Sequence, residues 1–165
     1  MTTLEGGLDG LDAVPGEWDL VLCHFVLRYR PAGSRDVAML AERVRPGGMI
    51  SIVEVNPDAV VLRRLVRGGP AEALAELDEG ILHSVTFDHH ARKVALREVE
   101  DRLGALGLQA AARYGIRVAN DLILDDDAKR DPAYFDDLLR LELALCDREP
   151  FNRLGFGWQV VAQRP

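Results

Sequence analysis

Residues 18–56 decide the fold of this chain, and they read WDLVLCHFVL-RYRPAGSRDVAMLAER-VRPGGMISIVEVN. Two short apolar runs flank one amphipathic segment, which is typical of a β-α-β unit. Runs that are apolar on both faces belong to a parallel sheet covered by helices on both sides. The connection between two such strands is right-handed. The sequence therefore predicts an α/β fold with helices on both faces of a sheet.

The apolar runs mark about four strands, for which we expect the ranges Trp18–Cys23, Met49–Val55, Leu108–Val118 and Phe156–Ala162. Between the first two strands, Pro46 should end the preceding helix, since proline removes a backbone donor. Gly47 and Gly48 should allow the positive φ of a tight turn.

Helical periodicity predicts the segments between these strands. Ser34 is expected to cap the first helix. Its buried positions are Val37, Leu40, Ala41 and Val44. Two short helices should cover Ala59–Val66 and Ala71–Leu77, and another should place Leu96, Val99, Leu103 and Leu106 before Gly107. The last helix should run from Asp131-Pro132 to Cys146, with a buried side formed by Phe135, Leu138, Leu139, Leu143 and Cys146.

Two segments lack a clear period. Residues 1–15 are either the end of a strand followed by a loop or a disordered start, and the pattern leaves both open. Residues 80–94 look like a polar, solvated loop; His83, His89 and His90 have no cysteine or carboxylate at ligand spacing, so no metal is expected. Asp125–Asp127 is interpreted as a solvated turn.

One domain is expected for 165 residues. We divide it into 1–15, a β-α-β unit at 16–56, a substrate-side insertion at 57–95 and an α/β segment at 96–165.

The charge of −7 argues against broad electrostatic binding of nucleic acid but allows a local basic patch. Cys23 and Cys146 are predicted to be reduced core thiols. No membrane-length apolar run and no leader at Met1 are found, so we expect a cytoplasmic protein without a membrane segment.

Three motifs resemble those of a known family. The WDLVLCH run and the VRPGGMISI run resemble the fourth and fifth strands of class I S-adenosylmethionine (SAM) dependent methyltransferases. Residues 114–121 (YGIRVAND) resemble a G-[IV]-R-V-F-H-D segment, and residues 141–151 (LELALCDREPF) resemble an L-E-x6-E-P-[YF] segment. Both segments are typical of the bacterial tRNA 5-carboxymethoxyuridine methyltransferases. The resemblance extends from about Glu5 to Pro165.

This resemblance implies an incomplete Rossmann-like sheet with family strands 4 to 7, the last inserted antiparallel between its fifth and sixth partners. It also implies methyl transfer from SAM to a carboxylate on a modified tRNA uridine. A carboxylate is already a nucleophile, so no general base and no catalytic residue is expected. The predicted substrate-binding residues are Tyr29, Asn56, Arg117, Asn120 and Arg148. Arg117 is the first candidate for holding the substrate carboxylate and Arg148 the second, with a structural ion pair as the alternative for each.

The chain departs from the family in two ways. Arg28 replaces an acidic residue that is usual in the family, and Ala119-Asn120 replaces an aromatic residue and a histidine. These changes leave open whether the chain acts on the same substrate as the family. No strand followed by the Gly-rich cofactor loop is found, and Gly6-Gly7 opens no helix. By resemblance, Met1–Glu5 is the tail of the third strand and earlier strands lie upstream.

The expected cofactor contacts are therefore few. Gly7, Leu8 and Asp9 should lie near the adenine of SAM, and His24 and Phe25 near its methionine part, although Phe25 fits a core position equally well. We expect the isolated chain to be inactive. Two alternatives stay open: a non-catalytic half-domain that pairs with itself or with a separate N-terminal half through the open strand edge Trp18–Cys23, and a methyltransferase for a small carboxylate or hydroxyl substrate.

Overall fold

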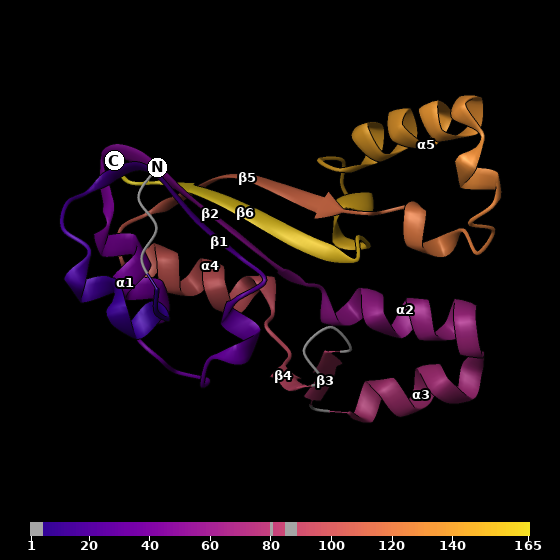
Figure 1. Cartoon of the computed structure of the whole chain (residues 1–165), viewed down its shortest axis with the longest axis horizontal. Helices are drawn as coiled ribbons and strands as arrows, with labels where there is room; N and C mark the ends of the chain where they lie inside the picture. Colours follow the sequence, from indigo (N-terminus) through magenta and orange to yellow (C-terminus); the bar gives the residue numbers. More distant parts are fainter. Residues whose placement is uncertain (1–4, 80, 85–88) are drawn as a thin grey trace.

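The computed structural model describes residues 5–79, 81–84 and 89–165. A four-stranded sheet forms its centre, with strands β1 (Trp18–His24), β2 (Val44–Val55), β5 (Gln109–Ile116) and β6 (Gly157–Gln163) (Figure 1). The order is β1-β2-β6-β5; β1 and β2 are parallel, and β6 lies antiparallel to both of its neighbours. The α/β class and the insertion of the last strand between its partners are thus confirmed.

Helices α1 (Asp36–Glu42) and α4 (Leu96–Ala105) lie on the same side of the sheet (Figure 1). Their periodic apolar residues and the inward residues of the central strands form the core, because that arrangement removes the most apolar surface from water. The core contains Cys23, Val37, Leu40, Ala41, Ile50, Ile52, Val99, Leu103, Val160 and Ala162. The predicted core positions of these two helices are correct apart from two: Val44 is buried but belongs to β2, and Leu106 is 40% exposed.

Strand β2 begins at Val44, earlier than the predicted start at Met49. Strand β2 pairs with β1 from Val44 onward, with an irregularity between Trp18 and Leu20. Gly47 has a φ of 76°, as the turn requires. A Cβ on Gly48 would lie 2.9 Å from the carbonyl oxygen of Arg45, so only glycine fits there. Ser34 does not cap α1; its hydroxyl donates to the Asp36 carboxylate instead.

The connection after β2 contains α2 (Pro57–Gly68), α3 (Pro70–Asp78) and a hairpin of β3 (Ile81–Ser84) with β4 (His89–Arg92). The prediction of an irregular loop over residues 80–94 is wrong for these two strands. Short strands are stabilised by cross-strand pairing, which a periodicity search does not detect. Residues 80 and 85–88 of that predicted loop lie outside the described residues, and Val94 at its end is buried in the core, not solvated.

The start of the chain is helical in its described part. The 3-10 helix η1 (Leu8–Ala13) replaces the predicted loop, and it packs Leu8 and Leu11 against the core. The predicted strand remnant at Met1–Glu5 lies, apart from Glu5, outside the described residues. Four further 3-10 turns complete the described elements: η2 (Leu27–Tyr29), η3 (Asn120–Leu122), η4 (Ala128–Arg130) and η5 (Phe151–Arg153).

Helix α5 (Pro132–Leu145) starts as expected, with the Asp131 side chain accepting from the Tyr134 N–H at 2.9 Å. Its predicted buried side is wrong. Leu138 is buried, but Phe135 is 52% and Leu143 65% exposed, and Leu139 is exposed as well. The helix lies on the side of the sheet opposite α1 and α4 (Figure 1). Periodicity identifies an apolar side of a helix but not what covers it.

The sheet face opposite α1 and α4 is largely open. β1 pairs with β2 alone among the described strands. Trp18, Leu20 and Leu22 alternate along β1 and are each more than half exposed. Met49, the register partner of Leu20, is exposed on the neighbouring strand.

Among the helices that the structure describes, none has both the length and the hydrophobicity to cross a bilayer.

Candidate substrate site at the carboxyl edge of the sheet

Four chain segments meet where the parallel strands end. The residue after β1, Phe25, donates its N–H to the Val53 carbonyl at 2.7 Å. The residue after β2, Asn56, donates its N–H to the Phe156 carbonyl at 2.8 Å, and Phe156 donates in turn to the Arg117 carbonyl at 3.3 Å. Ligands of open α/β sheets bind at this edge. We call Phe25, Arg28, Glu54, Arg63, Arg117, Asp121 and Phe156 the carboxyl-edge cluster.

Two arginines share one aromatic ring and one acid in this cluster. The guanidinium carbons of Arg63 and Arg117 each lie 4.6 Å from the centroid of Phe156. The buried Asp121 carboxylate accepts from Arg117 Nε at 2.9 Å and lies 3.0 Å from Arg63 Nε. One carboxylate cannot neutralise two guanidinium groups, so the surplus positive charge favours an anionic ligand.

A third arginine extends the cluster to the end of β1. The Arg28 guanidinium lies 5.0 Å from the Phe25 centroid and 5.2 Å from the Tyr29 centroid. Its Nε lies 3.8 Å from Glu54 Oε2, and its backbone N–H donates to Glu54 Oε1 at 3.2 Å. The charge reversal noted in the sequence at Arg28 is thus matched by a buried acid on β2.

Positive backbone φ angles occur in two non-glycine residues of the described chain, Phe25 at 58° and Arg117 at 56°. This conformation is costly for large side chains and persists where the surrounding structure enforces it. Both residues belong to the carboxyl-edge cluster and flank Phe156; the Phe25 and Phe156 ring centroids are 6.5 Å apart. Such strain collects at binding sites, which supports a functional role for this edge.

Burial shapes the electrostatics of the cluster. It lowers the pKa of Arg63, and the positive charges of Arg117, Arg67 and Arg64 add to that effect against the attraction of Asp121. Burial likewise raises the pKa of the Glu54 carboxyl, against the opposing effect of Arg28. The chain is acidic overall, yet Arg28, Arg63 and Arg117 make this edge locally basic.

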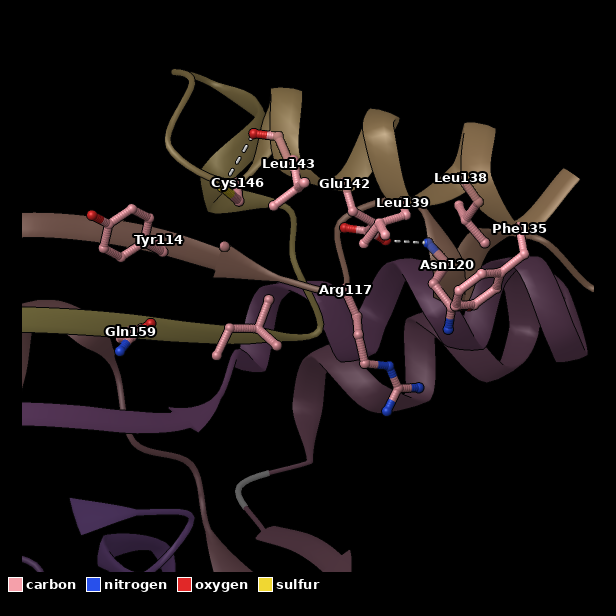
Figure 2. Close-up of a pocket in the computed structure, with 12 residues that line it drawn as sticks. Tyr114, Arg117, Asn120, Phe135, Leu138, Leu139, Glu142, Leu143, Cys146 and Gln159 are labelled. Atoms are coloured by element: carbon pink, nitrogen blue, oxygen red, sulfur yellow. Dashed lines mark hydrogen bonds between the residues drawn. The ribbon is translucent and has the colours of Figure 1, made fainter. Parts of the chain in front are cut away.

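Beside the cluster is an open hollow of about 500 Å³ between α5 and the ends of β5 and β6. Its lining is mainly apolar and includes Phe135, Leu138, Leu139 and Leu143 from α5. Figure 2 shows that Glu142 points from α5 towards Asn120, whereas Arg117 extends away from α5 towards the elements beneath it. The Arg117 side chain remains 48% exposed despite its bond to Asp121.

The structure brings together four of the five predicted substrate-binding residues. Tyr29 and Arg117 belong to or contact the cluster, and Asn120 follows Arg117 in the same loop. The Asn56 amide is already occupied: it donates to the Arg153 and Gly155 carbonyls and accepts from the Asp58 N–H. Arg148 lies exposed in the turn after α5 and forms no ion pair with a described residue.

The predicted cofactor residues fall into two groups. His24 is exposed at the end of β1, where its Nε2 lies 3.0 Å from Ser51 Oγ, and Phe25 belongs to the cluster. Gly7 precedes η1, Leu8 packs on the core, and Asp9 binds Arg30. In the described part of the chain, no strand is followed by a glycine-rich loop. No group of three His, Cys, Asp or Glu in this described part could hold a metal ion.

The two cysteines should differ in reactivity. Burial raises the pKa of the Cys23 thiol to about 12, and Glu54 and Asp36 contribute to the shift. Cys146 is half-buried beside the hollow, so the expectation of a core thiol holds for Cys23 alone. Because the thiolate is the reactive form, one thiol per chain should react with Ellman's reagent at pH 8 and two after denaturation. Two rapidly reacting thiols in the folded chain would contradict this assignment.

Sequence comparisons find two methyltransferases that resemble this chain. No protein-family model matches the chain. A tRNA 5-carboxymethoxyuridine methyltransferase of Escherichia coli K12 is 28% identical over 147 residues, which cover 89% of this chain and 54% of the relative. Its counterpart in E. coli O157:H7 is 26% identical over the same coverage. The chain thus spans about half the length of the curated relatives it matches.

Solved structures show the same fold. A SAM-dependent methyltransferase from Mesorhizobium loti matches with a TM-score of 0.52 and 16% identity over 90% of this chain and 62% of its own. A proposed SAM-dependent methyltransferase from Listeria monocytogenes matches with a TM-score of 0.54 and 12% identity over 92% and 63%. The chain corresponds to the C-terminal part of the class I methyltransferase fold. Its carboxyl-edge cluster lies where the parallel strands β1 and β2 of that fold end.

Sequence reasoning did not identify Arg63, Asp121, Glu54 or Phe156 as site residues. Arg63 and Asp121 come from α2 and η3, 58 positions apart, and periodicity cannot predict that they meet. A signal existed for Asp121 alone, because it ends the segment that carries Arg117.

Proposed function

We propose that this chain is the substrate-recognising part of a SAM-dependent methyltransferase that acts on an anionic acceptor, in the first place a carboxylate on a modified tRNA uridine. One observation carries the proposal. Arg117 is half-exposed, has a positive φ and places its guanidinium at the carboxyl edge, where Arg63 contacts the same Phe156 ring and the same Asp121 carboxylate. The sequence relationship to tRNA 5-carboxymethoxyuridine methyltransferases supports the acceptor class. A cytoplasmic location is part of the proposal.

The residues of the cluster would bind and orient the acceptor. Arg117 would pair with its carboxylate, since a guanidinium forms two parallel hydrogen bonds with this group. Phe25, Tyr29 and Phe156 would surround the remainder with apolar surface and exclude water, and Asn120 would contact the base. SAM, when bound, supplies a methyl group activated by its sulfonium. No base has to remove a proton from a carboxylate, so alignment carries the rate.

Calorimetry with the chain tests this proposal. Titration with 5-carboxymethoxyuridine should give measurable binding, and uridine should bind at least about 10-fold more weakly because it lacks the charge-assisted contacts. Titration with SAM should give weak binding, because His24 and Phe25 hold only one end of it. Labelled methyl transfer to tRNA and to small carboxylates then separates the two acceptor classes. Tight SAM binding by this chain would contradict the incomplete cofactor site.

The open edge favours a second candidate function, a half-domain that pairs with a second copy of itself. An antiparallel pairing of β1 with β1 of the copy, centred on Val21, would place Leu20 opposite Leu22 on both sides of a two-fold axis. It would satisfy the free backbone groups and extend the apolar stripe formed by Trp18, Leu20 and Leu22, which is now exposed.

Light scattering after size-exclusion chromatography tests the pairing. The chain should elute with the mass of a dimer, and Leu22→Lys should give a monomer by placing a charge within the paired stripe. Leu143→Lys is the matched control, since Leu143 is 65% exposed against 58% for Leu22 and belongs to α5, which lies apart from β1 (Figure 1). A monomeric wild-type chain, or an equal effect of both substitutions, would rule out this mode of association.

A further inference from the structure

Glu142 of α5 fills an anion-binding nest in the loop that carries Arg117. Its Oε2 accepts from the Val118 N–H at 2.8 Å. Its Oε1 accepts from the N–H groups of Ala119 and Asn120 at 3.0 and 2.7 Å. Three successive amides that point at one oxygen pair form a concavity suited to an anion, and here the anion is a side chain from another element (Figure 2).

This contact fixes the middle of the loop from Arg117 to Asp121. The beginning of the loop is held where the Phe156 N–H donates to the Arg117 carbonyl. Its end is held by Asp121, which is bound to Arg63 and to Arg117 itself. With both ends tied to the carboxyl-edge cluster and the middle tied to α5, the positive φ of Arg117 is over-determined.

Polar contacts also dominate the attachment of α5. Leu138 is its one buried residue, and most of its other apolar side chains are exposed. Besides the Glu142 nest, the Gly115 N–H donates to the Cys146 carbonyl at 2.7 Å. A carboxylate that accepts from backbone amides forms stronger bonds than a neutral amide side chain does. The position of α5 and the conformation of the loop are therefore coupled through one side chain.

We propose that Glu142 is a positioning residue, which holds the 117–121 loop in the conformation that presents Arg117 to the substrate carboxylate. Glu142 itself does not touch the substrate in this scheme; it acts through the backbone of residues 118–120. The inference rests on the proposed function, because it assumes that Arg117 binds an anionic acceptor.

Glu142→Gln tests the proposal, since it keeps the shape but replaces one acceptor oxygen with a donor facing the nest. We expect the dissociation constant for 5-carboxymethoxyuridine to rise about 10-fold, with binding of uridine unchanged. Amide proton NMR signals of Val118, Ala119 and Asn120 should move upfield, and the Arg117 Nε–H signal should shift. Glu142→Asp, which restores the charge, should recover part of the affinity. Glu149→Gln is the control, because Glu149 pairs with Arg153 in the solvent-exposed turn.

The outcomes separate the two proposals. If the wild-type chain prefers 5-carboxymethoxyuridine to uridine and Glu142→Gln keeps that preference in full, the positioning role is wrong and the proposed function stands. If the wild-type chain shows no preference, the proposed function fails, and an unmoved Arg117 Nε–H signal in Glu142→Gln would overturn the positioning role as well. Should Glu142→Gln not fold, the same comparison is made with Glu142→Asp, for which full wild-type affinity and unshifted 118–120 amides would overturn it.

Discussion

Replacing Arg117 with methionine should weaken binding of 5-carboxymethoxyuridine by about 10- to 100-fold, the effect of losing charge-assisted hydrogen bonds to an ionised group. The reason is that Arg117 is the half-exposed guanidinium of the carboxyl-edge cluster, and its positive φ and its stacking on Phe156 fix its direction. Isothermal calorimetry of both proteins measures the change. Binding of uridine should stay the same.

Two controls make the Arg117 prediction specific. Arg140→Met removes an exposed arginine of α5 that pairs with Asp137, and it should leave the affinity unchanged. Arg148→Met tests the second sequence candidate, which lies exposed in the turn after α5. If Arg148→Met weakened binding while Arg117→Met did not, the substrate carboxylate would lie at the α5 turn and the assignment of the carboxyl edge would be wrong.

Replacing Arg28 with methionine should destabilise the fold by about 3 to 5 kcal/mol at pH 7, because it leaves a buried carboxylate without its counter-charge. Glu54 is 1% exposed in its side chain, and its remaining partners would be the backbone N–H groups of residues 27, 28 and 55. Urea denaturation followed by circular dichroism measures the loss.

The loss of stability in Arg28→Met should depend on pH in a defined direction. Burial raises the folded pKa of Glu54 above its ordinary value, and loss of Arg28 raises it further. The free-energy penalty for burying the charged Glu54 carboxylate therefore applies in full above the folded pKa. It decreases as the pH falls towards the pKa of Glu54 in the unfolded chain. The stability gap between wild type and Arg28→Met should narrow from pH 7 to pH 5.

A second substitution checks the cause of the Arg28 effect. Glu54→Gln in the Arg28→Met background removes the uncompensated charge, so the double variant should be more stable than Arg28→Met alone at pH 7. An equal loss at both pH values, with no rescue by the double variant, would show that packing of the Arg28 side chain on Phe25 and Tyr29, not the charge of Glu54, determines the stability.

Local sequence signals predicted the central layer of this fold well. The apolar runs predicted at Trp18–Cys23 and Met49–Val55 and the period of Val37, Leu40 and Ala41 describe the β-α-β unit, because strand and helix patterns depend on residues near in sequence. The position of the last strand came from the family resemblance and is correct. The β3–β4 hairpin was not predicted, since its four-residue strands depend on pairing with each other.

For the candidate site, too, the sequence did not predict which distant segments come together. Arg117 and Asn120 were identified because they lie in one recognisable segment. The partners that surround Arg117 are Arg63 from α2 and Phe156, which directly precedes β6, and they meet it only after the sheet has assembled. For α5, the sequence showed an apolar side, and the structure buries only Leu138 of it and leaves Phe135, Leu139 and Leu143 exposed beside the hollow. Contacts between distant segments carry no local pattern.

The most direct test compares 5-carboxymethoxyuridine with its methyl ester, the product of the proposed reaction, by calorimetry on the wild-type chain. The two ligands differ by one methyl group and one negative charge. If the carboxyl edge recognises the substrate carboxylate through Arg117, the acid should bind at least about 10-fold more tightly than the ester, and Arg117→Met should remove the difference. Equal affinities of the wild-type chain for the acid and the ester would contradict the account.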